Sequence, residues 1–153
     1  MDILIRTLNG EDVSQVVKIQ KQSPSAAQWN KMDYDRLIGQ AGNLTLVASD
    51  SSKPGIVLGF VVFRQVEDEA ELLNLAVAPS SRRGGIGWAL MKEGIQQLMQ
   101  SRARNIFLEV RASNQPAISF YAAMGFEPHS IRNGYYQNPD EDGYILKLEL
   151  PGS

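Results

Sequence analysis

The spacing of apolar and polar positions predicts an opening strand followed by two helices. Ile3 to Leu8 forms the predicted strand, and the cluster Asn9-Gly10-Glu11-Asp12 after it is typical of a helix start. Serine and proline at Ser23-Pro24-Ser25 interrupt the chain, and a second short helix is expected from about Asp33 to Gly39. The first helix is predicted from apolar side chains at helical spacing, at Val13, Val16, Val17 and Ile19.

Three strands and a long helix are predicted next. The strands are Leu44–Ser49, Ile56–Arg64 and Glu71–Ala78, which clusters of glycine, serine and proline separate. The segment Gly85–Ser101 carries apolar side chains at steps of three and four residues, which indicates an amphipathic helix. A strand, a helix and two more strands complete the chain, at Asn105–Val110, Gln115–Met124, Glu127–Arg132 and Tyr144–Leu150.

The resulting order, β-α-α-β-β-β-α-β-α-β-β, predicts a mixed sheet. Antiparallel meanders flank a β-α-β unit, so we expect an α/β (α+β) fold with helices packed on the faces of the sheet. The 153 residues fit a single domain, 1–153. A domain of that size buries one sizeable core.

Composition and charge narrow the classes of partner. Apolar residues make up 43% of the chain and charged residues 21%, close to the averages for globular proteins, so we expect a compact soluble domain. The formal net charge is −2, with acids and bases spread along the chain, which disfavours nucleic acid as a partner. No secretion signal is visible, and no run approaches the roughly 18 apolar residues of a membrane span. The expectation is a cytoplasmic protein with no membrane partner.

The inventory of reactive side chains excludes several chemistries. There is no cysteine, so disulfides, thiolate metal sites and a cysteine-bound acyl intermediate are excluded. The single histidine, His129, has no second histidine with which to hold a metal, and no metal site is predicted. No Gly-x-Ser-x-Gly elbow accompanies it, which disfavours a serine hydrolase.

A glycine-rich turn, Pro79–Gly87, leads from the third of the three strands into the long helix. Unpaired N–H groups and the positive end of the helix dipole favour an anion there, and Arg82 and Arg83 add charge-assisted contacts. This suits a pyrophosphate, although an ordinary tight connection has the same composition. The chain does not match the Rossmann pattern, because Leu90 occupies the position of the third glycine. It does not match a P-loop either, because Trp88-Ala89 stands where that motif has lysine and serine or threonine.

Polar and aromatic residues at unusual places in the predicted elements are further candidates for functional residues. Glu109 is the sole acid of its predicted strand, where a surface-facing position is one explanation. Tyr121 lies on a helix with an apolar face, where a core side chain is the default interpretation, and Asn114 is expected to cap that helix. Tyr135 and Tyr136 are adjacent in a predicted polar loop, and such aromatics indicate either a binding surface or partial burial beneath the loop.

Several motifs, taken in order, resemble the GCN5-related N-acetyltransferases (GNAT). Arg82-x-x-Gly85-x-Gly87 is similar to that family's [QR]-x-x-G-x-[GA] signature. The predicted order resembles the GNAT fold, a mixed, mostly antiparallel sheet of about seven strands flanked by about four helices. The resemblance is closest to the bacterial ribosomal-protein N-terminal acetyltransferases of the RimI type, through Glu71–Val77, Leu108–Asn114, Phe120-Tyr121, Gly125-Phe126 and Tyr135-Tyr136.

The resemblance implies a single GNAT domain that moves acetyl from acetyl-CoA directly to a primary amine. The implied acceptor is the N-terminal α-amine of a protein, with a ribosomal protein as the first candidate. Acetylation of a small-molecule amine or of a lysine side chain, or a non-catalytic CoA-binding module, stays open as an alternative.

The same resemblance implies roles for individual residues. Glu109 is the implied general base, and Tyr121 is the acid that protonates the leaving thiolate and also contacts the cofactor. The other implied cofactor contacts are Leu75, Ala76, Val77, Arg82, Arg83, Gly84, Gly85, Ile86, Gly87, Trp88 and Asn114. Implied acceptor contacts are Trp29, Tyr34, Asn74, Tyr135 and Tyr136, although a tryptophan between two helices is more often a core residue. Ser23–Trp29 matches the family pattern poorly, so the identity of the acceptor is the least constrained inference.

Overall fold

The strands and helices follow the order predicted from the sequence. The computed structural model describes residues 1–136 and 140–152. Among the described helices, none is long and apolar enough to cross a membrane. The elements are β1 (Ile3–Thr7), the 3₁₀ turn η1 (Gly10–Asp12), α1 (Val13–Lys21), α2 (Lys31–Leu37), β2 (Asn43–Asp50), β3 (Gly59–Val66), β4 (Glu69–Val77), the 3₁₀ turn η2 (Pro79–Ser81), α3 (Ile86–Gln100), β5 (Asn105–Arg111), α4 (Gln115–Ala123), β6 (Glu127–Tyr136) and β7 (Glu141–Glu149).

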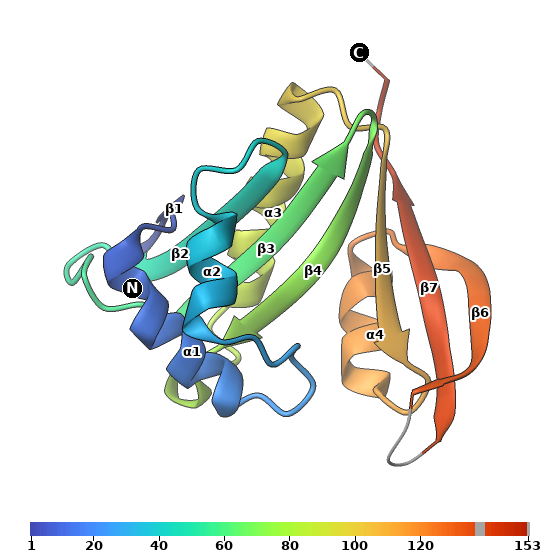
Figure 1. The fold of residues 1–153 in the computed structure, drawn as a ribbon, viewed down its shortest axis with the longest axis horizontal. Coiled ribbons are helices and arrows are strands. Elements are labelled where there is room, and N and C mark those ends of the chain that lie inside the picture. The colour runs from blue at the N-terminus through green and yellow to red at the C-terminus, as the bar shows by residue number, and fades with distance from the viewer. Residues whose placement is uncertain (137–139, 153) are drawn as a thin grey trace.

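All seven strands join one sheet in the order β1-β2-β3-β4-β5-β7-β6 (Figure 1). Neighbouring strands are antiparallel except β4 and β5, which are parallel and connected through α3. Helices α1 and α2 pack on one face of the sheet, whereas α3 and α4 pack on the other. This mixed sheet with helices on both faces confirms the predicted fold class.

Strands β4 and β5 pair at one end only and then separate. Their Cα partners run from Glu69 with Asn105 to Glu71 with Phe107, and beyond that point the strands diverge (Figure 1). The segment from Leu72 to Val77 pairs with β3 on one edge and has no partner among the described strands on the other. The N–H and C=O groups of such an edge are available to a ligand or to another chain.

A β-bulge in β4 changes which side chains face each side of the sheet. The pairing with β3 passes from Leu72 to Asn74, so Leu73 is the extra residue. Leu72 and Leu75 both pack on the α3 side, although strict alternation would place them on opposite sides. Leu73 packs on the α1 side, and Asn74 bonds there to residues of the α1–α2 region. The bulge therefore directs Asn74 toward the segment that follows α1.

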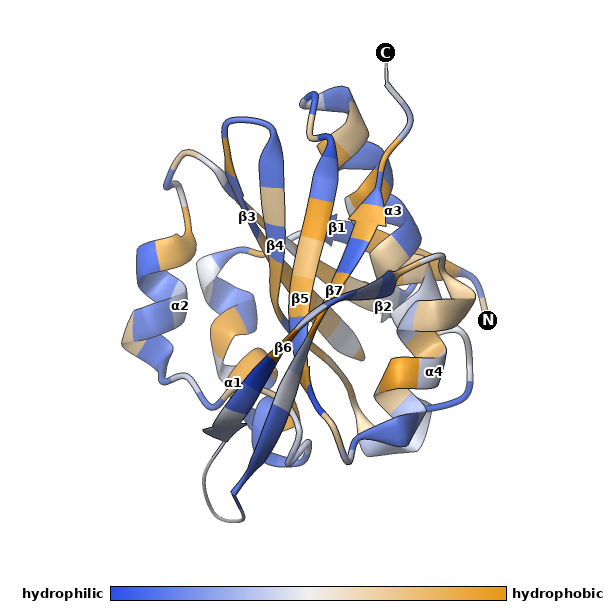
Figure 2. Cartoon of the chain, turned by 90° about the vertical axis from the view of Figure 1, so that its right-hand side faces the viewer, coloured by the Kyte–Doolittle hydropathy of each residue, from blue (hydrophilic) through white to orange (hydrophobic). Residues whose placement is uncertain are grey.

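Two apolar cores fill the two faces of the sheet. In the larger core α3 packs closely on β3, since a Cβ on Gly94 would lie 2.3 Å from Cε2 of Phe63. The smaller core lies beneath α1 and α2 and contains Val13, Val16, Tyr34, Phe60 and Val62. Figure 2 shows hydrophobic colours concentrated in the central strands and hydrophilic colours along much of β6, whose residues are mostly exposed.

Helix α3 begins differently from its neighbours. Side-chain oxygens of Asn9, Asn30 and Asn114 accept backbone N–H bonds at the starts of η1, α2 and α4. Helix α3 follows Gly85 instead, whose φ of +82° is a left-handed conformation that favours glycine. Because no side chain caps this end, the first N–H groups of α3 remain open to another acceptor.

Strand β6 is longer than predicted. The sequence indicated a strand over Glu127–Arg132 and then a polar loop to Pro139, but β6 extends to Tyr136 because Tyr136 pairs with Glu141 of β7. The loop prediction is therefore wrong for residues 133–136, which lie on the strand. Residues 137–139 of that predicted loop lie outside the described residues.

Candidate active site

A cleft of about 1730 Å³ opens where β4 and β5 separate. One wall consists of β4 and the start of α3, and the opposite wall consists of β5 and α4. The segment Ser23–Ala27, Trp29 and the end of β6 line the cleft on the α1 side. The lining therefore comes from both sides of the sheet, which is open at this point.

The turn between β4 and α3 presents a row of unpaired backbone N–H groups. None of the N–H groups of residues 85–88 donates a hydrogen bond to another described residue. The first to do so is that of Ala89, which donates to the carbonyl of Gly85 at 2.9 Å. With the positive end of the α3 dipole behind them, these groups are suited to bind phosphate oxygens.

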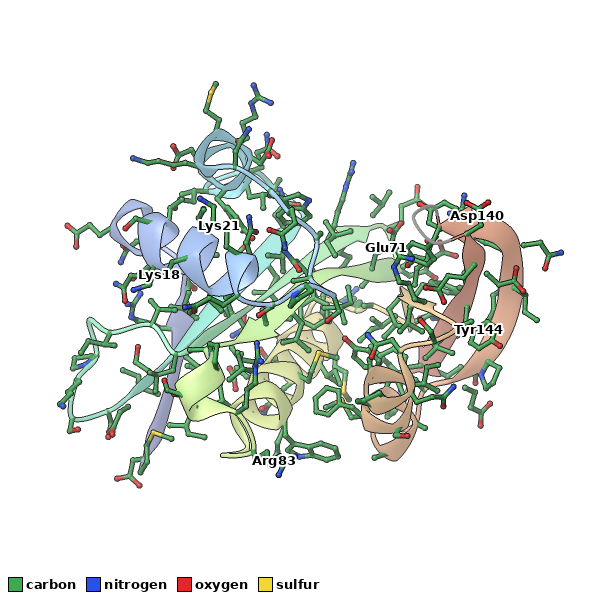
Figure 3. The ribbon with its side chains drawn as sticks, turned by 90° about the horizontal axis from the view of Figure 1, so that it is seen from below. Lys18, Lys21, Glu71, Arg83, Asp140 and Tyr144 are labelled. Carbon is green, nitrogen blue, oxygen red and sulfur yellow. The ribbon has the colours of Figure 1, made fainter. Side chains whose placement is uncertain are left out.

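The two arginines of this turn differ in what they contact. Arg82 Nε donates to the carbonyl of Val77 at 3.2 Å, and its Nη2 donates to the carbonyl of Gln22 at 3.0 Å and to Ser23 Oγ at 3.1 Å. The Arg82 side chain thereby joins the turn to the end of α1 while lining the cleft, and its role as a cofactor contact stays a prediction. Arg83 forms no ion pair with a described residue and lies at the outer edge of the molecule on the α3 side (Figure 3).

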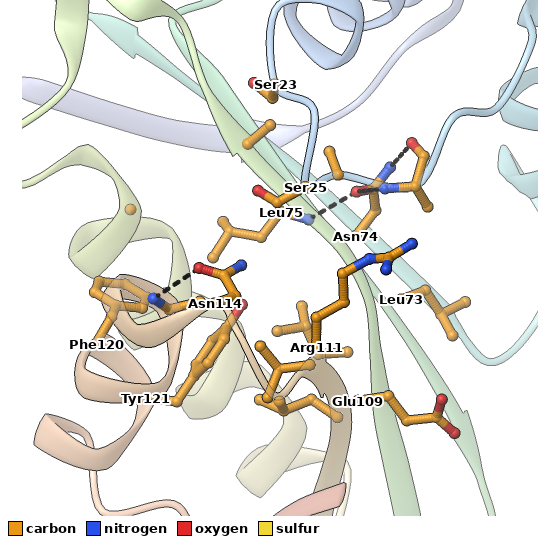
Figure 4. A pocket seen from close by; sticks show the side chains of 18 of the residues that line it. Ser23, Ser25, Leu73, Asn74, Leu75, Glu109, Arg111, Asn114, Phe120 and Tyr121 are labelled. Atoms are coloured by element: carbon orange, nitrogen blue, oxygen red, sulfur yellow. Dashed lines mark hydrogen bonds between the residues drawn. The ribbon is translucent and has the colours of Figure 1, made fainter. Parts of the chain in front are cut away.

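Helix α4 brings Asn114 and Tyr121 to the cleft (Figure 4). Asn114 caps the helix by accepting the N–H of Ala117 at 3.3 Å, and its NH₂ group remains available. The Tyr121 ring packs edge to face against Phe120 and Phe126, with centroids 5.3 and 5.6 Å away, and its hydroxyl lies beside Asn114. Burial raises the pKa of Tyr121 above its ordinary value, so the phenol is protonated at neutral pH.

Glu109 lines the same cleft but is paired with a residue of β6. Arg132 Nη1 donates to Glu109 Oε1 at 2.6 Å, and the two side chains are 46% and 31% exposed, respectively. The hydrogen bond to Glu109 raises the pKa of Arg132, which remains a cation. Figure 4 shows the Glu109 carboxylate directed away from Tyr121. The two candidate catalytic groups thus approach the cleft from different sides and do not contact each other.

Tyr135 and Tyr136 line the cleft from the end of β6, each beside a guanidinium. Arg132 Cζ lies 3.8 Å from the centroid of the Tyr135 ring, and Arg111 Cζ lies 4.3 Å from that of Tyr136. The two rings meet edge to face at 5.1 Å, and Arg111 also pairs with Glu141 at 2.9 Å. These contacts hold the end of β6 against β5 and leave Tyr135 46% exposed beside the cleft.

Asn74 fastens the segment after α1 to β4. Its side chain accepts the N–H of Ala27 at 3.1 Å and donates to the carbonyl of Ala27 at 3.0 Å and to the Tyr34 hydroxyl at 3.2 Å (Figure 4 shows the two bonds with Ala27). The residue is only 4% exposed. Its side-chain bonds position the segment that lines the cleft, and because Asn74 also lines the cleft, its contact with the acceptor stays a prediction.

Tyr34 and Trp29 have different environments. Tyr34 is fully buried, bonds through its hydroxyl to Gln20, and packs edge-on against Phe60 at 5.9 Å, so it does not line the cleft. The prediction that Tyr34 forms a wall of the acceptor site is therefore wrong, because α2 packs this ring into the core. Trp29 packs against Tyr34 at 5.4 Å and, being only partly buried, lines the cleft.

Sequence reasoning missed the partner of Glu109. Arg132 precedes the paired tyrosines and ends the predicted strand Glu127–Arg132, where it was assigned no role. The two partners are 23 positions apart and come together only because β7 lies between β5 and β6 in the sheet. The only sequence signal was a cation close to two aromatic residues.

A sheet opened between two parallel strands, with a phosphate-type turn at the mouth of the opening, is the architecture of GNAT acetyltransferases. The model of the Acetyltransferase (GNAT) family matches residues 13–126, and the chain belongs to this family. Enzymes of the family use acetyl-CoA as acyl donor, and the unpaired N–H groups of the turn, the open edge of β4 and the Asn114 amide fit that molecule.

Individual relatives are similar over most of the chain. The ribosomal protein bS18-alanine N-acetyltransferase of Escherichia coli is 40% identical over 98 residues, which cover 63% of this chain and 66% of that enzyme. The Salmonella typhimurium enzyme of the same name is 37% identical over 136 residues, which cover 85% of this chain and 86% of that one. A crystal structure of the Escherichia coli ribosomal-protein-alanine N-acetyltransferase matches with a TM-score of 0.85 at 29% identity, covering 99% of this chain and 96% of that chain.

Proposed function

We propose that this protein transfers acetyl from acetyl-CoA to the N-terminal α-amine of a protein, with a ribosomal protein as the first candidate. The observation that carries the proposal is the two-sided cleft. The phosphate-type turn and Tyr121 lie on the side of α3 and α4, whereas Tyr135, Trp29 and the Glu109–Arg132 pair line the side toward α1 and β6. The names of the bacterial relatives support an N-terminal alanine as acceptor.

The cleft suits direct transfer between two substrates that meet in the opening of the sheet. Acetyl-CoA supplies an activated thioester carbon. Glu109 accepts the proton of the attacking amine, directly or through water, as the nitrogen–carbon bond forms. Tyr121 donates its phenolic hydrogen toward the sulfur as the carbon–sulfur bond breaks. No cysteine is present to carry the acetyl group, which favours one direct displacement.

An α-amine suits a general base as modest as the Glu109 carboxylate better than a lysine does. The α-amine has a pKa of about 7.7–8.0, so about a tenth of it is neutral at pH 7, whereas less than about one in a thousand lysine side chains is neutral. One carboxylate beside a guanidinium is then sufficient to remove the proton during attack. A cytoplasmic location fits the proposal, since both acetyl-CoA and ribosomal proteins are present there.

The test is acetylation of a panel of amines, read by mass spectrometry. The panel contains peptides with free N-terminal alanine, the same peptides with a blocked N-terminus and an internal lysine, and small polyamines. We expect acetyl groups on the free N-termini alone. Acetylation confined to lysine or to small amines would overturn the acceptor assignment, and acetyl-CoA binding without turnover on any amine would overturn the catalytic assignment.

A further inference from the structure

Trp88 lies outside the apolar face of α3. It is 46% exposed, at a position where a polar side chain would satisfy an amphipathic helix. An exposed tryptophan in the first turn therefore has no explanation in the core contacts of α3. The buried residues of that helix are Ile86, Leu90, Met91, Gly94 and Leu98.

The indole of Trp88 is held in place and yet remains open. It meets Phe120 of α4 edge to face, with centroids 6.3 Å apart and planes at 83°. This contact fixes the ring and leaves nearly half of the residue uncovered. Trp88 also lines the cleft together with Gly85 and Gly87, so an aromatic surface adjoins the unpaired N–H groups of the turn.

Arg83 flanks the same N–H groups with a positive charge. Its φ of +67° is uncommon for a residue with a side chain, and such strain persists only where the surrounding structure holds it. Its guanidinium forms no ion pair within residues 1–136 and 140–152, and Figure 3 shows it at the outer edge of the turn. A cation and an aromatic ring thus border one group of phosphate-type donors.

We infer that Trp88 binds the adenine ring of acetyl-CoA and that Arg83 binds the phosphate on its ribose. The pyrophosphate of acetyl-CoA joins the pantetheine arm to an adenosine that carries this additional 3′-phosphate. When the N–H groups of the turn hold the pyrophosphate, the adenosine is restricted to groups that border the turn. This inference rests on acetyl-CoA as acyl donor and is independent of the acceptor.

The chemistry of the two side chains matches the two parts of that adenosine. Every nucleobase has a π face, and stacking on an aromatic side chain improves affinity by about 5- to 100-fold. A guanidinium forms charge-assisted, often bidentate contacts with a phosphate. The pair therefore anchors the end of the ligand farthest from the thioester and contributes to affinity without taking part in acetyl transfer.

Calorimetric binding of two ligands by the intact chain tests the inference. Acetyl-CoA carries the adenosine, whereas S-acetyl-4′-phosphopantetheine carries the same thioester arm without it. We expect Trp88→Ala to weaken the binding of acetyl-CoA by about tenfold and to leave the affinity for the shorter ligand unchanged. Trp88→Phe should bind both ligands with affinities close to those of the wild type. Equal weakening of both ligands would assign Trp88 to holding α4 in place and overturn the inference, as would no weakening of either.

The phosphate contact and the stacking have separate readouts. Arg83→Ala should weaken the binding of acetyl-CoA but not that of its 3′-dephospho form. Equal weakening of the binding of both ligands would overturn the Arg83 assignment. In a Trp29→Phe protein Trp88 is the single tryptophan, and acetyl-CoA should quench its fluorescence while the shorter ligand should not. Met99→Ala removes another exposed apolar side chain from α3 and serves as the matched control with unchanged affinity for both ligands. If the wild-type chain bound neither ligand, the use of acetyl-CoA itself would fail.

Discussion

Arg132 and Glu109 form a short ion pair between β6 and β5, with 2.6 Å between Nη1 and Oε1. The side chains are 46% and 31% exposed, and an ion pair this open to solvent contributes about 0–1 kcal/mol. The carboxylate is therefore held in a defined place but can be released at small cost. An incoming ammonium group carries the same charge as the guanidinium and could take its place beside the carboxylate.

We expect Arg132→Gln to lower the KM for an acceptor peptide by at most about fivefold and to leave kcat close to wild type. The limit follows from the small free energy of an exposed ion pair. Steady-state kinetics on an N-terminal peptide measure both constants. Glu109→Gln is the comparison, with kcat expected to fall by about 10²–10³ because the proposed general base is lost. A comparable loss of kcat in Arg132→Gln would show that the guanidinium takes part in the chemistry.

Tyr121→Phe is expected to reduce kcat by about 10²-fold while the Kd for acetyl-CoA changes little, since only the hydroxyl is removed. The group acts in its protonated form, and burial raises its pKa above the ordinary value of about 10, so it stays protonated through a wider alkaline range. The profile of kcat against pH should accordingly show no alkaline loss from this residue below about pH 10. An alkaline limb near pH 8 that disappeared in Tyr121→Phe would contradict the assignment.

Asn74→Ala should destabilise the protein by about 2–4 kcal/mol, because it leaves the partly buried N–H and C=O of Ala27 and the buried Tyr34 hydroxyl without this partner. Urea unfolding gives the free energy. The acceptor KM should rise as well, since the segment that lines the cleft loses its attachment to β4. Asn43→Ala removes an exposed bond to Gln40 and should stay within about 0.5 kcal/mol of wild type. Equal effects of the two substitutions would refute the anchoring role.

Gly94→Ala should destabilise the fold even though alanine is the better helix former. The new Cβ would lie 2.3 Å from Cε2 of Phe63, and overpacking of this kind costs about 1–3 kcal/mol. The higher helix propensity of alanine offsets about 1 kcal/mol of this destabilisation. Thermal unfolding measures the net loss, and Phe63→Leu in the same chain should recover part of it by giving up the ring. A Gly94→Ala protein as stable as wild type would mean that α3 can move away from β3.

The order of strands and helices was predictable because each element carries its own periodicity. Helix α3 was predicted within one residue of its observed ends, since its apolar stripe and the preceding glycines are local signals. The family motifs then brought Gly85, Asn114 and Tyr121 to one cleft, where the structure indeed finds them. For Asn114 and Tyr121 the position on α4 alone decides which way the side chain faces.

Features that depend on distant contacts were not predictable from the pattern. Tyr34 was predicted to contact the acceptor, although packing of α2 on β3 buries it completely. Nothing in the sequence indicated that the Arg82 guanidinium donates to the carbonyl of Gln22, directly after α1. The extension of β6 required pairing with β7, and the Arg132 contact with Glu109 required the order of three strands. No spacing of residues in the sequence predicts any of these contacts.

The place of the extra residue in β4 decides which changes of length this strand tolerates. Leu73 stands outside the two-residue repeat of side-chain direction, so deleting it would restore strict alternation and leave Asn74 on the α1 side and Leu75 on the α3 side. A residue inserted or deleted between Asn74 and Val77 would instead turn the residues after it to the opposite sides and reverse the cleft-lining end of β4. In chains that keep this cleft, position 73 can therefore be substituted or lost, whereas the number of residues from Asn74 to Val77 is fixed.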